Sequence, residues 1–584
     1  PPNAPSLYND NGELNWADNT WDNPMADFYQ TYTSKIETFN ANAHLSYEFI
    51  KGLKGILNAG YNTMNIYEVQ TTPQSSYNPN TLGNRRTSTV NTGGRSTWIL
   101  EPQLAYEKSW GEHRLQAMVG GTFQKSVDRT LVVRGTGYTS DLMLENLQGA
   151  SEVQVRRSQE NIYEYKAGFI RLNYNYNQRY IINLTGRRDG SSRFGPGKAF
   201  ANFGAVGLAW LFSNEDFINK GLPFLSFGKL RGSYGTNGSD QIGDYQFMDL
   251  WQTSIYPYQG VSGLTPIRAK NADFGWETNR KLEFAIELGF FNDRIFLTTN
   301  YFRNRTGNQL VGLPLPGITG FNSVQANLPA TIENTGWEFQ LQTDNIRGAN
   351  FNWHTNFNIS VLRNNLLEYP NLDQSPYARS YTIGHSLLDT KNYEFYGVNP
   401  DTGVYEVKDQ NDDGRITTSD DLISTGDIGI DFFGGLDNSF EYKLWDLSFF
   451  FQFVKQRQYN SMLAFSTPGF ISNQPVAVLE RWQSPGDVTD VQKLTSTYGD
   501  AYFAYYDALT SNYTREDTSF IRLRNISLSY TLPKNTLPGM DMRLYVLGQN
   551  LFTITGYSGL NPEFSSSTSL PTLRQYMLGV QLTF

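Results

Sequence analysis

The segment 409–420 contains the residue types and the spacing of a calcium-binding loop. It follows the EF-hand template, in which Gly414 permits a sharp turn and Arg415 offers its backbone carbonyl. Ca²⁺ takes about 6–8 oxygen ligands. Aspartate replaces the usual glutamate at the last position, and an acidic turn without metal is the alternative. The expected ligands of this structural site are Asp409, Asn411, Asp413, Arg415 and Asp420.

Apart from this calcium-type loop, no group of residues has the type and spacing of a functional site, and none has the spacing of a catalytic site. The glycine-rich run 190–198 lacks the G-K-[ST] ending of a phosphate-binding loop. The sequence has no G-x-S-x-G elbow and no cysteine, so serine-elbow and thiol chemistry are both excluded. The four histidines are scattered at His44, His113, His354 and His385. We therefore predict that the chain is not an enzyme, and we assign no catalytic residue.

Aromatic residues in the long polar segments are candidates for stacking on sugar rings. They are Tyr256, Tyr258, Tyr377, Tyr381, Phe503, Tyr505 and Tyr506. For any one of them, packing within a loop or against a partner protein is the favoured alternative.

Hydrophobic residues at every second position recur along the chain and indicate strands with one apolar face. The segments 43–49, 170–176, 445–453 and 576–584 show this pattern. We count about 17 strands in this way, and a tilted membrane strand needs about 9–11 residues. The mean hydropathy is −0.47, and no run approaches the roughly 18 apolar residues of a spanning helix. The sequence therefore predicts an all-β fold, a transmembrane antiparallel β-barrel with a polar lumen.

Short and long connections alternate between these strands. The short turns are at 51–52, 110–112, 177–178, 292–293, 347–348 and 443–444. The long segments are 71–93, 130–158, 238–277, 307–330, 365–430 and 458–517. Outer-membrane barrels have short periplasmic turns and long extracellular loops. We therefore expect 365–430, which contains the calcium-type loop, to lie outside the cell.

The alternation also predicts how the chain crosses the membrane. It would begin outside and end inside, which requires an odd number of strands, whereas bacterial single-chain barrels have an even number. We expect an odd number of further strands upstream. Unpaired strand edges in lipid cost several kcal/mol per polar group, so this chain is not expected to close a barrel alone.

Several segments resemble hallmarks of the SusC/RagA-like family of TonB-dependent outer-membrane transporters of Bacteroidetes. They are GRRDGSSRFG (186–195), LRGSYG (230–235), WET (276–278), FIRLRN (520–525), LSYTLP (528–533), LYVLGQNL (544–551), GYSG (556–559) and NPE (561–563). Each motif is short, but the ordered set extends over most of the chain and is specific.

The resemblance implies import of large nutrients, oligosaccharides or oligopeptides, across the outer membrane of a Gram-negative cell. It implies a barrel of about 22 strands around an N-terminal plug. This chain (1–584) would be the C-terminal part of the barrel, because the plug, the first strands and the TonB box have no counterpart in it.

The implied partners are a SusD-like lipoprotein lid, TonB–ExbB–ExbD through the N-terminal part, and outer-membrane lipid or lipopolysaccharide. A dimer of transporter–lid pairs is also compatible with the family. The net charge of −9 argues against a nucleic-acid partner. A passive porin or adhesin barrel and a secreted glycan-acting enzyme are the alternatives.

Overall fold

The computed structural model describes residues 4–80, 83–254, 258–533, 536, 539–564 and 570–583, so Tyr256 and Phe584 lie outside the described residues. The long strands are β1 (Thr31–Ile50), β2 (Leu53–Thr72), β3 (Thr87–Trp110), β4 (His113–Thr136), β5 (Glu152–Tyr176), β6 (Tyr180–Ser191), β7 (Phe200–Trp210), β8 (Leu225–Ser239), β11 (Glu277–Phe290), β12 (Ile295–Gly307), β15 (Thr331–Arg347), β16 (Phe351–Glu368), β21 (Ile430–Tyr442), β22 (Trp445–Tyr459), β24 (Phe520–Thr531), β25 (Asp541–Thr555) and β26 (Gln575–Thr583). The prediction of an all-β protein is confirmed.

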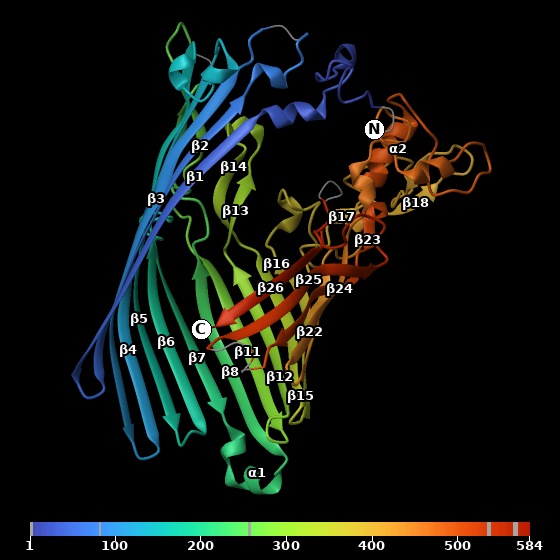
Figure 1. The fold of residues 1–584 in the computed structure, drawn as a ribbon. Helices are drawn as coiled ribbons and strands as arrows, with labels where there is room; N and C mark the ends of the chain where they lie inside the picture. The colour runs from blue at the N-terminus through green and yellow to red at the C-terminus, as the bar shows by residue number, and fades with distance from the viewer. Residues whose placement is uncertain are drawn as a thin grey trace.

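These strands form one antiparallel sheet in which each strand pairs with the next along the chain. The sheet contains 18 strands, one of which, β23 (Arg515–Asp517), has only three residues. The sequence predicted about 17. In the described part of the chain no pairing joins β1 to β26, so these two strands are the edges of the sheet. Figure 1 shows the sheet curving around a wide hollow, with β1 and β26 on opposite sides of it.

The connections are sorted by length to the two ends of the sheet, which we call the short-turn end and the long-loop end (Figure 1). Tight turns at the short-turn end use left-handed backbone, as at Asn177 and Gln178, where φ is 52° and 51°. Asparagine tolerates this region better than most residues. The longer connection 213–225 is also at this end and contains the helix α1 (Asp216–Gly221).

The long-loop end has regular structure of its own. It contains the helix α2 (Asp500–Leu509) and four small hairpins or ladders: β9 (Leu250–Thr253) with β10 (Leu264–Arg268), β13 (Gln309–Pro314) with β14 (Ser323–Leu328), β17 (Lys391–Asn392) with β20 (Ile423–Ser424), and β18 (Phe395–Val398) with β19 (Tyr405–Val407). Short 3-10 segments at this end occupy Ala17–Asn19, Pro24–Tyr29, Gln74–Ser76, Asp141–Met143, Leu147–Gly149, Gly317–Thr319, Leu372–Gln374, Ser461–Ala464, Val476–Glu480 and Asn512–Thr514, and one more, Phe212–Asn214, precedes α1 at the short-turn end. Within the described ranges, no helix combines the length and the apolar character needed to span a membrane.

The two faces of the sheet differ in polarity because side chains alternate along each strand. Register places Phe284, Tyr301 and Trp337 side by side on the outer face. Phe284 is 53% exposed and Trp337 is 48% exposed, which suits contact with lipid. One residue along, Asn300 and Glu338 are partners on the inner face. The outer face is therefore apolar and the inner face polar in this part of the sheet.

Exposed aromatic residues gather near the short-turn end of the outer face. They are Trp110, Tyr176, Tyr180, Trp210, Phe291, Tyr442 and Trp445. Membrane barrels place aromatic girdles at the two water interfaces. This group has the position expected for one girdle.

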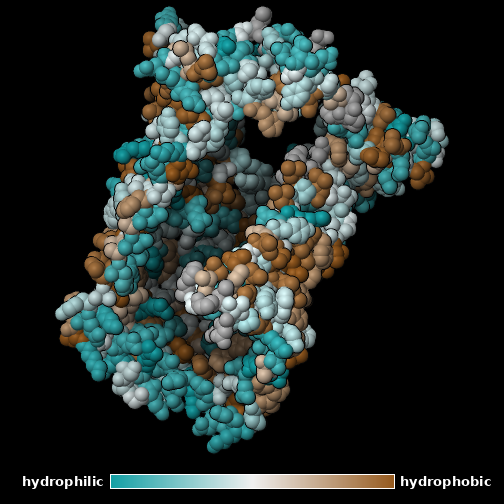
Figure 2. All heavy atoms as spheres, viewed as in Figure 1, coloured by the Kyte–Doolittle hydropathy of each residue, from teal (hydrophilic) through white to brown (hydrophobic). Residues whose placement is uncertain are grey.

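The hollow of the sheet is open to solvent in the described chain. Every residue of β1 is exposed, on both faces, and β26 is exposed almost throughout. Figure 2 shows the hollow as a deep cleft, with hydrophilic residues around the short-turn end and hydrophobic residues over the outer flank on the right. The inner side of β1 is thus not covered by any described element.

Candidate functional site: the inner wall and the long-loop end

The inner wall carries charged groups that neutralise one another. Both Lys229 and Arg231 approach Glu287, with Nζ–Oε1 and Nε–Oε1 distances of 3.3 and 3.0 Å. The Arg231 Nη2 also donates to Asn300 Oδ1 at 2.9 Å. A recess of about 280 Å³ lies beside them and is also lined by Glu283. The wall therefore offers ion pairs and amides to whatever fills the lumen.

Two sequence motifs meet in a hydrophobic cluster at the long-loop end. Phe194 of the GRRDGSSRFG motif packs against Phe274 and Trp276, with ring centroids 6.0 and 5.0 Å apart. Phe274 is fully buried and Phe194 is 2% exposed. A Cβ at Gly195 would lie 2.6 Å from the backbone oxygen of Ala272, so only glycine fits this approach. Gly195 of this run therefore serves close packing against the loop.

Arg193 extends this cluster to the loop that follows β8. Its Nε donates to Asp244 Oδ1 at 2.9 Å and its Nη1 donates to the Asp240 carbonyl at 2.9 Å. The guanidinium also lies 4.3 Å from the ring centroid of Tyr163, whose hydroxyl donates to Asp240 Oδ2 at 2.8 Å. The motif therefore fastens the 240–276 loop to β5 and β6.

The motifs near the C-terminus meet in a second cluster, around a buried arginine. Arg522 of FIRLRN is 4% exposed, and all three of its guanidinium nitrogens have partners. It donates to Glu563 Oε2 at 2.6 Å, to Asn561 Oδ1 at 2.7 Å and to Thr553 Oγ1 at 2.8 Å. Arg524 donates to the other oxygen of Glu563. The NPE motif is thereby held against β24, on the inner face.

Two long loops, 365–430 and 458–517, pack together through one hydrophobic core. Tyr405 of β19 and Tyr505 and Ala508 of α2 form its buried centre. Tyr405 stacks on Tyr505 at 6.3 Å and its hydroxyl lies 3.2 Å from that of Tyr513. Burial raises the pKa of both Tyr405 and Tyr505. These loops are therefore one folded body on the rim of the sheet (Figure 1).

The candidate stacking aromatics divide into two groups. Tyr377, Tyr381 and Tyr505 pack within the loops, which was the favoured alternative to sugar stacking. Tyr258, Phe503 and Tyr506 are exposed at 78%, 59% and 49%. Only the exposed group is available to a ligand or a partner.

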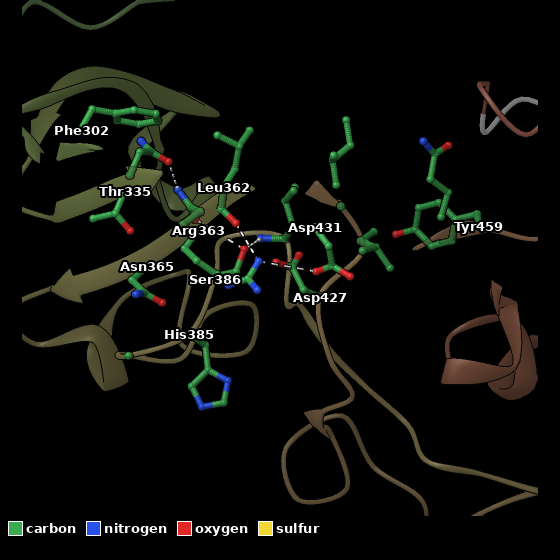
Figure 3. Close-up of a pocket in the computed structure, with 18 residues that line it drawn as sticks. Phe302, Thr335, Leu362, Arg363, Asn365, His385, Ser386, Asp427, Asp431 and Tyr459 are labelled. Atoms are coloured by element: carbon green, nitrogen blue, oxygen red, sulfur yellow. Dashed lines mark hydrogen bonds and ion pairs between the residues drawn. The ribbon is translucent and has the colours of Figure 1, made fainter. Parts of the chain in front are cut away.

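A recess of about 920 Å³ opens where β16 and β21 separate below the loop body. Figure 3 shows its polar lining, with Arg363 facing Asp431 and His385 at the edge. The Arg363 Nη1–Asp431 Oδ1 distance is 3.8 Å. Amides and both signs of charge line this recess, so it suits a polar ligand without selecting one charge.

His385, at the edge of the recess, is grouped with Asp389 and Ser424, which lie outside its lining, and the geometry of the three does not fit nucleophilic catalysis. Asp389 accepts from His385 Nδ1 at 2.8 Å and from Ser424 Oγ, and Ser424 lies 3.2 Å from the same Nδ1. A catalytic serine needs the other ring nitrogen. Burial alone would raise the pKa of Asp389, but its hydrogen bonds to Ser424, His385 and the Gly426 N–H keep that pKa below its usual value. The hydrogen bonds among these three side chains therefore have a structural role.

The structure brings together three of the predicted calcium ligands. Asn411 Nδ2 lies 3.1 Å from Asp413 Oδ2, and Asp409 Oδ2 accepts from the Gly414 N–H at 2.7 Å. Asp413 Oδ1 accepts from the N–H of Arg415 at 2.8 Å. The second carboxylate oxygen of Asp409 is buried and has no hydrogen-bond partner. The first half of the loop therefore has the turn expected of the template.

Asp420, the fifth predicted ligand, is placed differently. Its Oδ2 accepts from the hydroxyls of Thr417 and Ser419, each at 2.9 Å. The neighbouring Asp421 closes the loop instead, accepting from the N–H groups of Gln410 and Thr417 at 2.8 and 2.7 Å. Across the described residues no three His, Cys, Asp or Glu side chains are grouped as ion ligands. The oxygens available to an ion are thus mainly those of the 409–415 half.

Comparisons with known proteins decide the family. The family described as "TonB dependent receptor-like, beta-barrel" matches residues 1–551. This chain belongs to that family. Its members are outer-membrane transport proteins of Gram-negative bacteria, not enzymes, and the SusC/RagA-like resemblance read from the motifs is confirmed.

Individual relatives agree with this family. TonB-dependent receptor P3 of Formosa agariphila is 28% identical over all of this chain and 62% of its own length. TonB-dependent receptor SusC of Bacteroides thetaiotaomicron is 27% identical over 82% of this chain and 49% of its own length. The chain thus spans less than two thirds of these receptors.

A solved structure agrees with the fold. The RagAB peptide transporter superposes with a TM-score of 0.85 at 24% identity, over 96% of this chain and 63% of that one. The shared architecture is the large antiparallel sheet with long loops at one end.

Proposed function

We propose that the complete receptor imports large nutrients across the outer membrane in a TonB-dependent manner. The observation that carries the proposal is the sheet itself, which has an apolar outer face, a polar inner face and its long folded loops gathered at one end. Its strands would supply most of the barrel wall, and its long-loop end would face the cell exterior. The substrate class is oligosaccharide or oligopeptide. RagAB, which has a similar fold, is a peptide transporter, and this supports oligopeptides as the substrate class.

The proposed mechanism assigns binding and enclosure to this chain, and no covalent chemistry. A SusD-like lipoprotein would cover the long-loop end, and the 365–430 and 458–517 body would form part of the rim that it meets. A plug and further strands, from the part of the receptor that relatives have in addition, would fill the hollow and pair with the exposed β1. TonB–ExbB–ExbD would act on that part. Two transporter–lid pairs could then associate as a dimer.

Uptake by intact cells tests this function. Cells that contain the complete receptor should accumulate labelled oligosaccharides or oligopeptides only when the inner membrane is energised. A protonophore should reduce uptake to the level of a receptor-deletion strain. A passive porin would continue to admit the label without energy, and that outcome would contradict the proposal.

We also propose that the 409–420 loop binds calcium, with Asp409, Asn411, Asp413 and the Arg415 carbonyl as the principal ligands. Support comes from the turn geometry and from the unpartnered buried oxygen of Asp409. Extracellular calcium modules bind with dissociation constants of about 0.1–1 mM. Bound calcium would order this loop against the loop body.

Calcium should therefore protect the loop from proteolysis. In the complete receptor, we expect 2 mM Ca²⁺, roughly twice the weakest of those constants, to slow cleavage within 409–420 and a chelator to restore it. Asp409→Ala should abolish the protection. Asp412→Asn is the matched control, because this neighbouring acid is not a ligand in the template. Equal cleavage of wild type with and without Ca²⁺ would refute the site.

A further inference from the structure

The outer face of the sheet carries four arginines immediately beyond its aromatic row, towards the long-loop end. We call this group the arginine patch. It consists of Arg280 of β11, Arg303 and Arg305 of β12, and Arg363 of β16. Register fixes its position, since Arg303 pairs with Leu282, two residues from Phe284 on the same face. The aromatic row of Phe284, Tyr301 and Trp337 is thus followed by a row of guanidinium groups.

The patch is not neutralised by the chain. Arg305 Nε lies 2.6 Å from Glu333 Oε2, and Arg363 lies 3.8 Å from Asp431. Within the described residues, the side chains of Arg280 and Arg303 have neither a hydrogen bond nor an ion pair. Two positive charges therefore remain without a partner.

One of these two unpartnered arginines, Arg280, also faces another arginine across a strand pair. Arg280 is the direct register partner of Arg305. Like charges at directly opposite positions destabilise a sheet. A bound anion would reduce that repulsion. The nearby carboxylates are those of Glu333 on β15, which pairs with Arg305, and of Glu368 on β16, which lines the adjacent recess.

The patch has space for a polar head and lies beside space for apolar chains. A recess of about 660 Å³ is lined by Arg280, Arg305, Gly307 and Glu368. A groove of about 550 Å³, lined mostly by apolar residues such as Leu208, Leu230, Leu282 and Phe284, lies along the same face. Both border β11, where Arg280 and Phe284 are about 14 Å apart at roughly 3.4 Å per residue.

We propose that this surface binds a phosphorylated glycolipid of the outer leaflet, of the lipid A type. Its phosphate would lie on Arg280 and Arg303, and its acyl chains would lie in the groove below. Guanidinium groups bind phosphate in a bidentate, charge-assisted manner. The aromatic row marks the level where headgroups begin. A lipid is the one partner that surrounds this flank of a membrane barrel, whereas a lid protein would cover the loops.

The inference rests on the proposed orientation, with the long-loop end outside. It is tested with the complete receptor in nanodiscs of phosphatidylethanolamine that contain a trace of phosphorylated lipid A or of the same lipid after phosphatase treatment. Native mass spectrometry measures the fraction that carries lipid A. The double variant Arg280→Gln/Arg303→Gln should retain about 25-fold less phosphorylated lipid A, since each charge near a membrane surface contributes roughly a factor of five.

Two controls distinguish a specific lipid-binding site from nonspecific electrostatic attraction of the lipid. Lys281→Gln removes a charge from the opposite face of the same strand and should leave retention unchanged. Dephosphorylated lipid should bind wild type and the double variant equally weakly. The inference is overturned if the double variant keeps its phosphorylated lipid A, or if Lys281→Gln loses as much.

A labelling experiment keeps this test distinct from that of the proposed function. The chain has no cysteine, so Ile318→Cys introduces a single thiol in an exposed loop. A membrane-impermeant maleimide should label it on intact cells. If residue 318 is labelled but the Arg280→Gln/Arg303→Gln variant retains as much phosphorylated lipid A as wild type, only the lipid site is refuted. If residue 318 is not labelled from outside, the orientation is refuted, and the import proposal with it.

Discussion

Replacing Arg522 by alanine is expected to destabilise the C-terminal strands by about 3 kcal/mol, because breaking one partner of a buried ion pair leaves the other uncompensated. Glu563 would keep Arg524, but its Oε2 and the side chain of Asn561 would lose their charged donor. Denaturant unfolding of the complete receptor, followed by tryptophan fluorescence, measures the loss.

Arg156→Ala is the control for this prediction. Arg156 is an exposed arginine on β5, and its removal should change the free energy of unfolding by no more than about 0.5 kcal/mol. If Arg522→Ala were as mild as this control, the FIRLRN and NPE motifs would not be held together by their ion pairs.

Phe274→Ala should release the 240–276 loop from the sheet. Phe274 is fully buried between loop and strands, and truncation of a buried phenylalanine costs about 3–5 kcal/mol. Because the cluster is local, the loss appears as local opening and not as global unfolding. Limited proteolysis of the loop should accelerate about 100-fold, the factor that corresponds to roughly 3 kcal/mol.

Phe217→Ala provides the matching control, since Phe217 of α1 is 65% exposed at the opposite end of the sheet. It should leave the cleavage rate of the loop unchanged. A Phe274→Ala receptor whose loop resists protease as wild type does would show that Arg193 alone holds the loop.

The strands and their connections could be predicted because they depend on local patterns. Alternation at Ile170, Leu172, Tyr174 and Tyr176 identified β5, and the turn at 177–178 marked its end. Residues that alternate in this way lie on the same face of the strand. The loop body was not predictable in the same way. The helix α2 lies inside a segment recognised only as long and polar.

The roles of the motifs could not be read from the sequence. Arg522 and Glu563 are 41 residues apart, and Phe194 and Phe274 are 80 apart, so no periodicity connects them. Resemblance identified the motifs as family features and left their purpose open. The structure shows that these four residues fasten loops of the long-loop end to the sheet, by a buried ion pair and by aromatic packing.

The calcium loop was predicted from spacing alone, and the structure adds detail to that prediction. Spacing places a side chain at each template position but does not say which of two adjacent acids turns inward. Here Asp421, which is fully buried, closes the loop by accepting backbone N–H groups, while Asp420 accepts from the hydroxyls of Thr417 and Ser419. Metal binding there stays a prediction.

The assignment of the two faces is the central claim, and spin labels at neighbouring residues test it most directly. In the complete receptor reconstituted in lipid, Phe284→Cys and Glu283→Cys place labels on adjacent residues of β11 that point to opposite faces, as do Tyr301→Cys and Asn300→Cys on β12. Oxygen concentrates in the bilayer, so labels at 284 and 301 should relax rapidly with oxygen and those at 283 and 300 should not. Equal relaxation at both members of each pair, or faster relaxation at 283 and 300, would contradict the lipid-facing sheet.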